Sequence, residues 1–121
     1  MAVILVVDDE SFLRTVAETI LTANGHLVLE AASGKEALSI CEKTAVDLVI
    51  SDLWMPEMDG FELISSLRDS YTDLPILAIS GVFSGEFLRS VRLLGPAETL
   101  EKPFTGEQLL AMVNKLLAEK K

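Results

Sequence analysis

The stretch DLVISDLWMPEMDG, residues 47–60, carries an apolar run directly into an aspartate. Leu48, Val49 and Ile50 are typical of a buried strand, and Asp52 follows two residues later. Burial of an ionised carboxylate at the end of such a strand is costly unless a charged group pairs with it. Asp52 therefore either turns out to water or has a partner elsewhere in the chain.

Further apolar runs predict a sheet around this strand. The run Val3 to Val7 is continuous and rich in β-branched residues, as in strands that are covered on both faces of a parallel sheet. Shorter runs predict four more strands, which are His26 to Glu30, Asp47 to Ser51, Pro75 to Ser80 and Ala97 to Leu100. The sequence thus predicts five strands.

The segments between these strands have helical spacing. The apolar stripe of the first helix consists of Phe12, Leu13, Val16, Ala17, Ile20 and Leu21, and Asn24-Gly25 ends it. The sequences at 33–36 (SGKE) and 105–108 (TGEQ) have the spacing of capping boxes, so helices are expected to begin there. Apolar residues in the ranges Phe61 to Leu67 and Phe87 to Leu94 predict two further helices.

Strict alternation of strands and helices predicts an α/β fold. A strand that returns parallel to its neighbour needs a crossover, so this order implies a parallel sheet with helices on both faces. The length of 121 residues suits one domain over residues 1–121. In such sheets, ligands bind beyond the carboxyl ends of the strands.

Composition and charge restrict the partners. The formal net charge of −9 predicts repulsion from nucleic acid and from anionic membranes, so we expect direct binding to neither. The apolar run Ala2 to Val7 is too short for a membrane span and lacks the basic start of a signal peptide. Cys41 is the single cysteine and cannot form an internal disulfide, which fits a cytoplasmic protein.

Reactive side chains follow the predicted strands at their carboxyl ends. They are Asp8-Asp9, Asp52, Ser80 and Lys102. Three carboxylates at one edge repel one another unless a cation neutralises them, and Mg²⁺ prefers such oxygen ligands. A carboxylate can attack phosphorus, while an ammonium and a hydroxyl stabilise the transferring phosphoryl group. The edge therefore has the groups that phosphoryl transfer needs.

This set of residues, in this order and spacing, closely resembles the receiver domain of two-component response regulators, in its single-domain form. The motifs are Asp8-Asp9, Asp52 within DLWMPEMDG, Ser80-Gly81 and Lys102-Pro103-Phe104, and the resemblance covers essentially the whole chain. It implies a flavodoxin-like (βα)5 fold, which is a doubly wound five-stranded parallel sheet of order 2-1-3-4-5. It also implies a cis Lys102-Pro103 peptide bond.

The resemblance implies a role for each residue in phosphoryl transfer. Asp52 would accept the phosphoryl group from a histidine kinase or a histidine phosphotransfer protein. Ser80 would hydrogen-bond the phosphoryl oxygens and Lys102 would pair with them. The chain would catalyse only its own phosphorylation and dephosphorylation. It would signal to a downstream target through the face formed by its fourth helix, fifth strand and fifth helix.

The resemblance also implies a metal site and a switch. Asp8, Asp9, Asp52 and the backbone carbonyl of Trp54 would hold Mg²⁺. The switch would involve Ser80, Thr99 and Lys102, but the family usually has an aromatic residue where this chain has Thr99. We therefore expect the switch to act through the loop 80–85 and the fourth helix. The large ring of Trp54 would slow attack by water on the phosphoryl group or contact the partner.

Two other functions fit parts of the pattern. A phosphatase that forms an aspartyl phosphate would need a second carboxylate close after the nucleophile, where this chain has Trp54 two residues on, and a substrate cap. A phosphate-independent binding module on a receiver fold would explain Thr99 but not the intact set of acids with Lys102. The chain ends with its fifth helix, and the sequence alone leaves open whether it stands alone or belongs to a longer protein.

Overall fold

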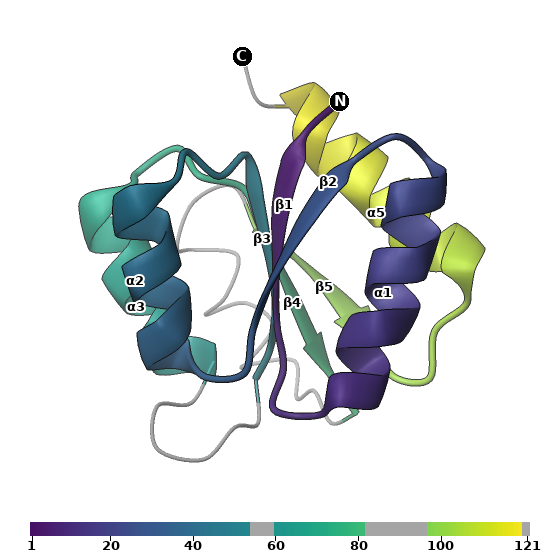
Figure 1. Ribbon diagram of the computed structural model, residues 1–121, viewed down its shortest axis with the longest axis horizontal. Helices are drawn as coiled ribbons and strands as arrows, with labels where there is room; N and C mark the ends of the chain where they lie inside the picture. The colour runs from purple at the N-terminus through teal and green to yellow at the C-terminus, as the bar shows by residue number, and fades with distance from the viewer. Residues whose placement is uncertain (54–59, 82–96, 120–121) are drawn as a thin grey trace.

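The computed structural model describes residues 1–53, 60–81 and 97–119. Its described strands form one parallel sheet in the order β2-β1-β3-β4-β5 (Figure 1). The strands are Val3–Val7 (β1), Leu27–Ala31 (β2), Leu48–Asp52 (β3), Ile76–Ser80 (β4) and Ala97–Glu101 (β5). The described helices are Ser11–Ala23 (α1), Gly34–Lys43 (α2), Gly60–Ser70 (α3) and Gly106–Glu119 (α5). The expected fold class and strand order are confirmed, whereas the helix expected over Phe87 to Leu94 lies outside the described residues.

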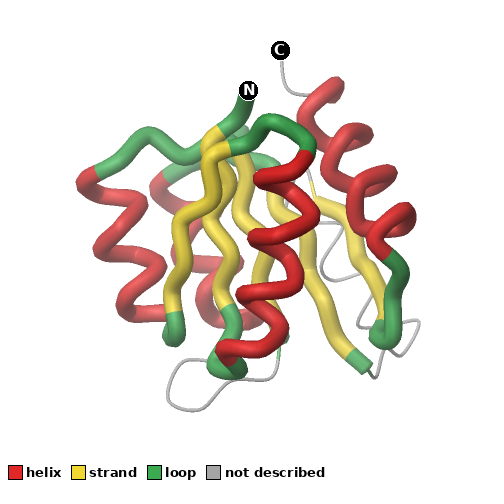
Figure 2. Tube along the Cα trace, turned by 45° about the vertical axis from the view of Figure 1, so that its right-hand side comes forward, coloured by secondary structure: helices red, strands yellow, loops and turns green. Residues whose placement is uncertain are grey.

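The helices cover both faces of the sheet and enclose two cores. Helices α1 and α5 lie on one face and α2 and α3 on the other, and the rotated view in Figure 2 keeps these layers apart. The core under α1 and α5 includes Ile4, Ile50, Leu77, Leu109 and Leu116. The opposite core includes Leu5, Val49, Leu63, Leu67 and Ile76. Each such side chain stabilises the fold by about 1.5–3 kcal/mol when fully buried.

Three of the strands, β2, β3 and β4, begin one residue later than predicted. At β2 and β3, the preceding residue binds the start of β1 with its side chain. The carboxylate of Asp47 accepts a hydrogen bond from the backbone N–H of Val3 at 2.8 Å. The Nδ1 atom of His26 accepts one from the N–H of Ala2 at 3.2 Å. Both side chains thus anchor the first strand, and His26 has a structural role.

The predicted helix starts at Ser33 and Thr105 are confirmed. The hydroxyl of Ser33 accepts a hydrogen bond from the N–H of Glu36 at 3.2 Å. The Thr105 hydroxyl accepts from the N–H of Gln108 at 3.1 Å, and the Gln108 side chain accepts from the N–H of Thr105 at 2.8 Å. This second start is a complete capping box.

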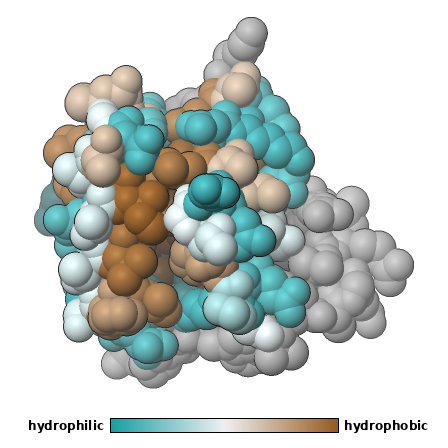
Figure 3. All heavy atoms as spheres, turned by 90° about the vertical axis from the view of Figure 1, so that its right-hand side faces the viewer, coloured by the Kyte–Doolittle hydropathy of each residue, from teal (hydrophilic) through white to brown (hydrophobic). Residues whose placement is uncertain are grey.

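The prediction that Phe12 belongs to the buried stripe of the first helix is wrong. Leu21 and Ala17 of α1 are buried, whereas Phe12 is 73% exposed. Figure 3 shows an apolar band on the face formed by α1 and α5. Phe12, Pro103 and Phe104 help to line a groove of about 420 Å³ there, beside Lys102.

No helix in the described part of the chain has the length and apolar character that crossing a membrane requires.

Candidate functional site

The carboxyl edge of the sheet brings together three side chains that are distant in the sequence. Asp8 follows β1, Asp52 ends β3, and Lys102 follows β5. Strands β1 and β3 are neighbours, but the chain leaves β1 toward β2 and leaves β3 toward β4. Such a reversal of strand order opens a crevice at the carboxyl ends, which is where ligands bind in open α/β sheets.

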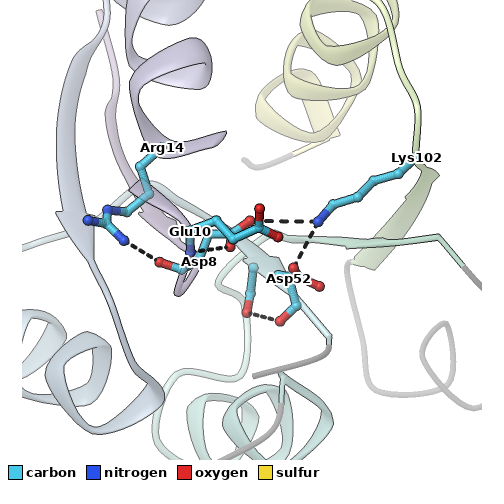
Figure 4. A network of polar contacts seen from close by, with 6 residues as sticks. Asp8, Glu10, Arg14, Asp52 and Lys102 are labelled. Atoms are coloured by element: carbon cyan, nitrogen blue, oxygen red, sulfur yellow. Dashed lines mark hydrogen bonds and ion pairs between the residues drawn. The ribbon is translucent and has the colours of Figure 1, made fainter. Parts of the chain in front are cut away.

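Lys102 is the partner of Asp52. Its Nζ atom lies 2.9 Å from Oδ2 of Asp52 and 3.8 Å from Oδ2 of Asp8 (Figure 4). The backbone fixes the start of this side chain, because the N–H of Lys102 donates to the carbonyl of Ser80 at 2.9 Å. The Lys102-Pro103 peptide bond is cis, as the resemblance implied.

Four carboxylates converge at this edge. Asp8, Asp9, Glu10 and Asp52 can each offer one ligand oxygen, and these atoms all lie within 4.8 Å of one another. Asp8 and Asp52 are buried, each with 5% exposure, while Asp9 and Glu10 are exposed. Glu10 was missing from the predicted site. The signal for it is the unbroken acidic run of residues 8–10, which continues past the pair that matched the motif.

The environment changes the proton affinity of two of these groups. Burial raises the pKa of Asp8 to about 6, and the charge of Asp52 adds to this, although the Glu10 N–H and Lys102 act in the opposite direction. Burial by itself lowers the pKa of Lys102, but the hydrogen bond and charge of Asp52 outweigh it and leave that pKa raised. Asp8 thus holds its proton more tightly than a free aspartate does, chiefly because it is buried, and Lys102 remains protonated at neutral pH.

The donor set fits a divalent cation. All four ligand groups are carboxylates, and hard oxygen ligands are those that Mg²⁺ prefers. The charge of Lys102 does not by itself balance the four carboxylates found among the described residues, so a cation at this edge would relieve repulsion between them. The arrangement therefore combines a nucleophilic carboxylate, a fixed ammonium and a place for a metal ion.

The other predicted residues lie nearby or outside the described part. Ser80 is buried at the end of β4. Thr99 is half-buried on the adjacent strand β5, where it pairs with Ala78, two residues before Ser80. Ser80 and Thr99 therefore lie on the same face of neighbouring strands. Trp54 and residues 82–85 of the expected switch loop fall outside the described residues.

Comparisons with known sequences agree with this geometry. The family model described as the response regulator receiver domain matches residues 4–114. The sensor kinase CckA of Brucella abortus (strain 2308) is 39% identical over 118 residues, which cover 96% of this chain and 12% of that protein. The probable transcriptional regulator ycf27 of Porphyridium aerugineum is 36% identical over 114 residues, which cover 94% of this chain and 47% of that protein. The chain spans less than half the length of these two relatives.

Two of the solved structures that match this chain are covered over nearly their whole length. The Vibrio cholerae chemotaxis protein CheY4 superposes with a TM-score of 0.91 at 36% identity, covering 96% of this chain and 98% of that chain. The receiver domain of the Francisella response regulator 1452 gives a TM-score of 0.92 at 30% identity, with 100% of both chains covered. With the family model matching most of its length, the chain belongs to the family of response regulator receiver domains.

Proposed function

We propose that the chain is a phosphorylation-controlled signalling receiver in which Asp52 accepts a phosphoryl group from a phosphohistidine. The donor is a histidine kinase or a histidine phosphotransfer protein. The observation that carries this proposal is the 2.9 Å contact between Lys102 Nζ and Asp52 Oδ2 at an edge where four carboxylates converge. Membership of the receiver family supports it.

The transfer is a displacement at phosphorus. A carboxylate oxygen of Asp52 forms the new O–P bond while the P–N bond to the donor imidazole breaks, and that nitrogen keeps the electron pair. Lys102 stays protonated and pairs with the phosphoryl oxygens, which removes negative charge from the transferring group. The hydroxyl of Ser80 donates a hydrogen bond to the same group.

Asp8, Asp9, Asp52 and the backbone carbonyl of Trp54 would hold Mg²⁺. When bound, Mg²⁺ supplies positive charge that offsets the carboxylates and the phosphoryl oxygens. Glu10 belongs to the same cluster and adds a fourth carboxylate. The chain acts on its own phosphoryl group, by transfer from phosphohistidine and later hydrolysis, and not on a separate substrate.

The surroundings of Lys102 favour a protein phosphodonor. The apolar groove beside it is lined by Phe12, Pro103 and Phe104, and exposed apolar patches of this kind typically mark contact surfaces. The donor would then rest on this groove while its phosphohistidine reaches Asp52. The free, buried Cys41 is compatible with such signalling in the cytoplasm.

Phosphorylation would change the binding of a downstream target through the face predicted for the fourth helix, β5 and α5, of which the fourth helix falls outside the described residues. Thr99 lies on β5, three residues before Lys102, and is half-buried there. Because this chain lacks the usual aromatic residue at that position, the switch runs through the loop 80–85 and the segment that follows. The output is a protein and not nucleic acid, because the net charge of −9 opposes DNA binding. The single-domain form and a place within a longer regulator are both compatible with these roles.

The experiment that tests this function is phosphorylation followed by mass measurement of the intact protein. The protein is incubated with Mg²⁺ and a small-molecule phosphodonor, with Asp52→Asn as the control. A gain of one phosphoryl group that requires both Mg²⁺ and Asp52 supports the proposal. Trp54 is the single tryptophan, and its fluorescence during the Mg²⁺ titration gives an independent signal of binding.

Other results would favour the alternative functions. An unchanged mass without any response to Mg²⁺ would indicate a phosphate-independent binding module. Turnover of the phosphodonor without a trapped phosphoprotein would indicate a hydrolase.

A further inference from the structure

Arg14 contacts the segment that carries three of the four carboxylates. It lies near the start of α1, and its side chain is only 17% exposed. Its Nη1 atom donates a hydrogen bond to the backbone carbonyl of Asp8 at 2.5 Å (Figure 4). Its Nε donates to Oε1 of Glu30 at 3.2 Å. The guanidinium thus joins α1, the end of β1 and strand β2.

Other contacts hold the rest of this segment, while Arg14 holds the carbonyl of Asp8. The N–H of Asp8 donates to the carbonyl of Ala31 at 3.1 Å, which fixes the nitrogen side of the residue to β2. The Asp8 carboxylate accepts from the N–H of Glu10 at 2.8 Å. Glu10 is the N-cap of α1 but makes no side-chain capping bond. The Asp8 carbonyl, from which the chain turns toward Asp9, is held by Arg14.

We infer that Arg14 is a positioning residue for the divalent cation: oriented by Glu30, it fixes the Asp8–Glu10 turn so that the carboxylates converge with Asp52. Arg14 acts through the backbone and not as a ligand, because a guanidinium has no lone pair to offer a cation. The planar guanidinium matters, because its Nε atom binds Glu30 while its Nη1 atom binds the carbonyl of Asp8. This inference rests on the proposed function and adds the residue that prepares the metal site.

The loss of the Arg14 charge and the loss of the turn that Arg14 fixes should change the Mg²⁺ affinity in opposite directions. Loss of a cation near four carboxylates strengthens Mg²⁺ binding if charge alone matters. Loss of the fixed turn weakens it, and removal of groups that orient metal ligands typically reduces affinity at least about tenfold. We therefore expect Arg14→Met to bind Mg²⁺ about tenfold more weakly than the wild type. Arg14→Lys keeps the charge and one contact, so its affinity should lie between the two.

The chain offers a matched control in Lys115. Its Nζ atom pairs with Glu98 Oε2 at 2.8 Å, so it also joins a helix to a strand carboxylate. Lys115→Met and Arg14→Met each remove one positive charge and one such ion pair. Lys115→Met should leave the Mg²⁺ affinity unchanged, because its partner Glu98 lies near the start of β5, whereas Lys102 and the acidic cluster lie at the carboxyl edge of the sheet.

A double variant distinguishes an effect of the Arg14 charge on Mg²⁺ affinity from an effect of the turn that Arg14 fixes. Arg14→Met with Glu30→Met removes both charges of the pair and leaves the formal net charge at −9. An effect of charge would be smaller in this variant than in Arg14→Met, because the removed charges of Arg14 and Glu30 have opposite signs. A positioning effect would persist, and the double variant should lose about as much affinity as Arg14→Met, because the two residues act as one unit.

The affinities are measured by titration of Mg²⁺ into the ¹⁵N-labelled protein and by following the backbone amides in ¹H–¹⁵N spectra. The same spectra report whether each variant is folded. Weaker binding by Arg14→Met and by the double variant supports the inference. Affinity equal to or tighter than that of the wild type overturns it, and leaves the proposed function standing if the wild type binds Mg²⁺ and gains a phosphoryl group. A wild type that binds no Mg²⁺ overturns both. If Arg14→Met does not fold, Arg14→Lys decides: weaker binding supports the inference, and wild-type affinity overturns it.

Discussion

Lys102 and Asp52 are fifty residues apart in the sequence, and Nζ of the first lies 2.9 Å from Oδ2 of the second. The contact answers the question raised by the buried strand that ends in an aspartate. The ammonium also lies 3.8 Å from Asp8, so one cation is shared by two buried carboxylates. Lys102 therefore stabilises the metal-free edge, and it competes there with any metal ion.

Removal of this ammonium should tighten Mg²⁺ binding and slow phosphoryl transfer. In Lys102→Met the carboxylates keep their charge but lose the competing cation, which favours Mg²⁺ by about 1 kcal/mol, or roughly fivefold in affinity. Transfer slows because the phosphoryl oxygens lose their ammonium partner. Mg²⁺ titration and the rate of mass gain from a small-molecule phosphodonor measure the two effects. Lys115→Met is the control, and equal affinities in Lys102→Met and wild type would contradict the prediction.

Asp8 should destabilise the metal-free protein at neutral pH. Its pKa is raised from 3.8 to about 6, so the folded state binds the proton more tightly than the unfolded state does. The stability that this shift contributes is complete below about pH 4 and is lost as the pH rises through about 6. Asp8→Asn has no carboxylate to ionise, and its amide oxygen can still accept from the N–H of Glu10.

We therefore expect Asp8→Asn to unfold less readily in urea than the wild type at pH 7.5, by about 1–3 kcal/mol without Mg²⁺. The difference should shrink toward pH 4. Asp69→Asn, at an exposed position on α3, has the same change in charge and should show little effect. A variant less stable than the wild type at pH 7.5 would show that the carboxylate supports the fold.

Saturating Mg²⁺ should reverse this order of stability. A ligand that binds only the folded state stabilises it according to its concentration and affinity. The wild type gains this stabilisation, while Asp8→Asn loses a ligand and gains less. Urea unfolding of both proteins with and without Mg²⁺ measures the gain. An equal gain in both would mean that Asp8 takes no part in metal binding.

Glu10 should contribute to metal affinity although it was absent from the predicted site. Its carboxylate lies with those of Asp8, Asp9 and Asp52. Glu10→Gln removes one negative charge from the cluster and should weaken Mg²⁺ binding by about two- to fivefold. Glu107→Gln, at an exposed position in the first turn of α5, is the matched control. The prediction fails if both variants bind Mg²⁺ as the wild type does.

The capping box of α5 should be worth about 1 kcal/mol in the free energy of unfolding. Thr105→Ala removes the hydroxyl that accepts from the N–H of Gln108, and the loss of such a cap typically costs about that much. Urea unfolding of Thr105→Ala, Gln108→Ala and the double variant gives the coupling between the two side chains. Thr22→Ala, at an exposed position inside α1, should not destabilise the protein, because alanine is the better helix former.

Patterns that depend on neighbours along the chain could be predicted from the sequence. The apolar runs predicted every strand of the sheet, because a strand buried on both faces must be apolar at successive positions. The helix starts at Ser33 and Thr105 were predicted because the side chain and the N–H it binds are three residues apart. The predicted strand ends placed Asp8, Asp52 and Lys102 at one edge of the sheet, since the carboxyl ends of parallel strands share one edge.

Contacts between distant segments were decided by the tertiary structure. Helical spacing placed Phe12 in one apolar stripe with Ala17 and Leu21, and only the folded chain shows that Phe12 is exposed while the other two are buried. His26 and Asp47, which were predicted to begin strands, instead bind the first strand with their side chains. Such bonds depend on which residues become neighbours in space, so local spacing cannot reveal them.

The sequence by itself determined the reactive groups and the edge at which they gather. The tertiary structure decided how they meet: which oxygen of Asp52 the ammonium contacts, that Glu10 joins the cluster, and that Arg14 links the Asp8 carbonyl to Glu30. The physical reason is that hydrogen bonds and ion pairs require separations of about 3–4 Å. Periodicity and motif spacing predict only the strand or face on which a residue lies. The distances between side chains of distant segments are known only from the folded chain.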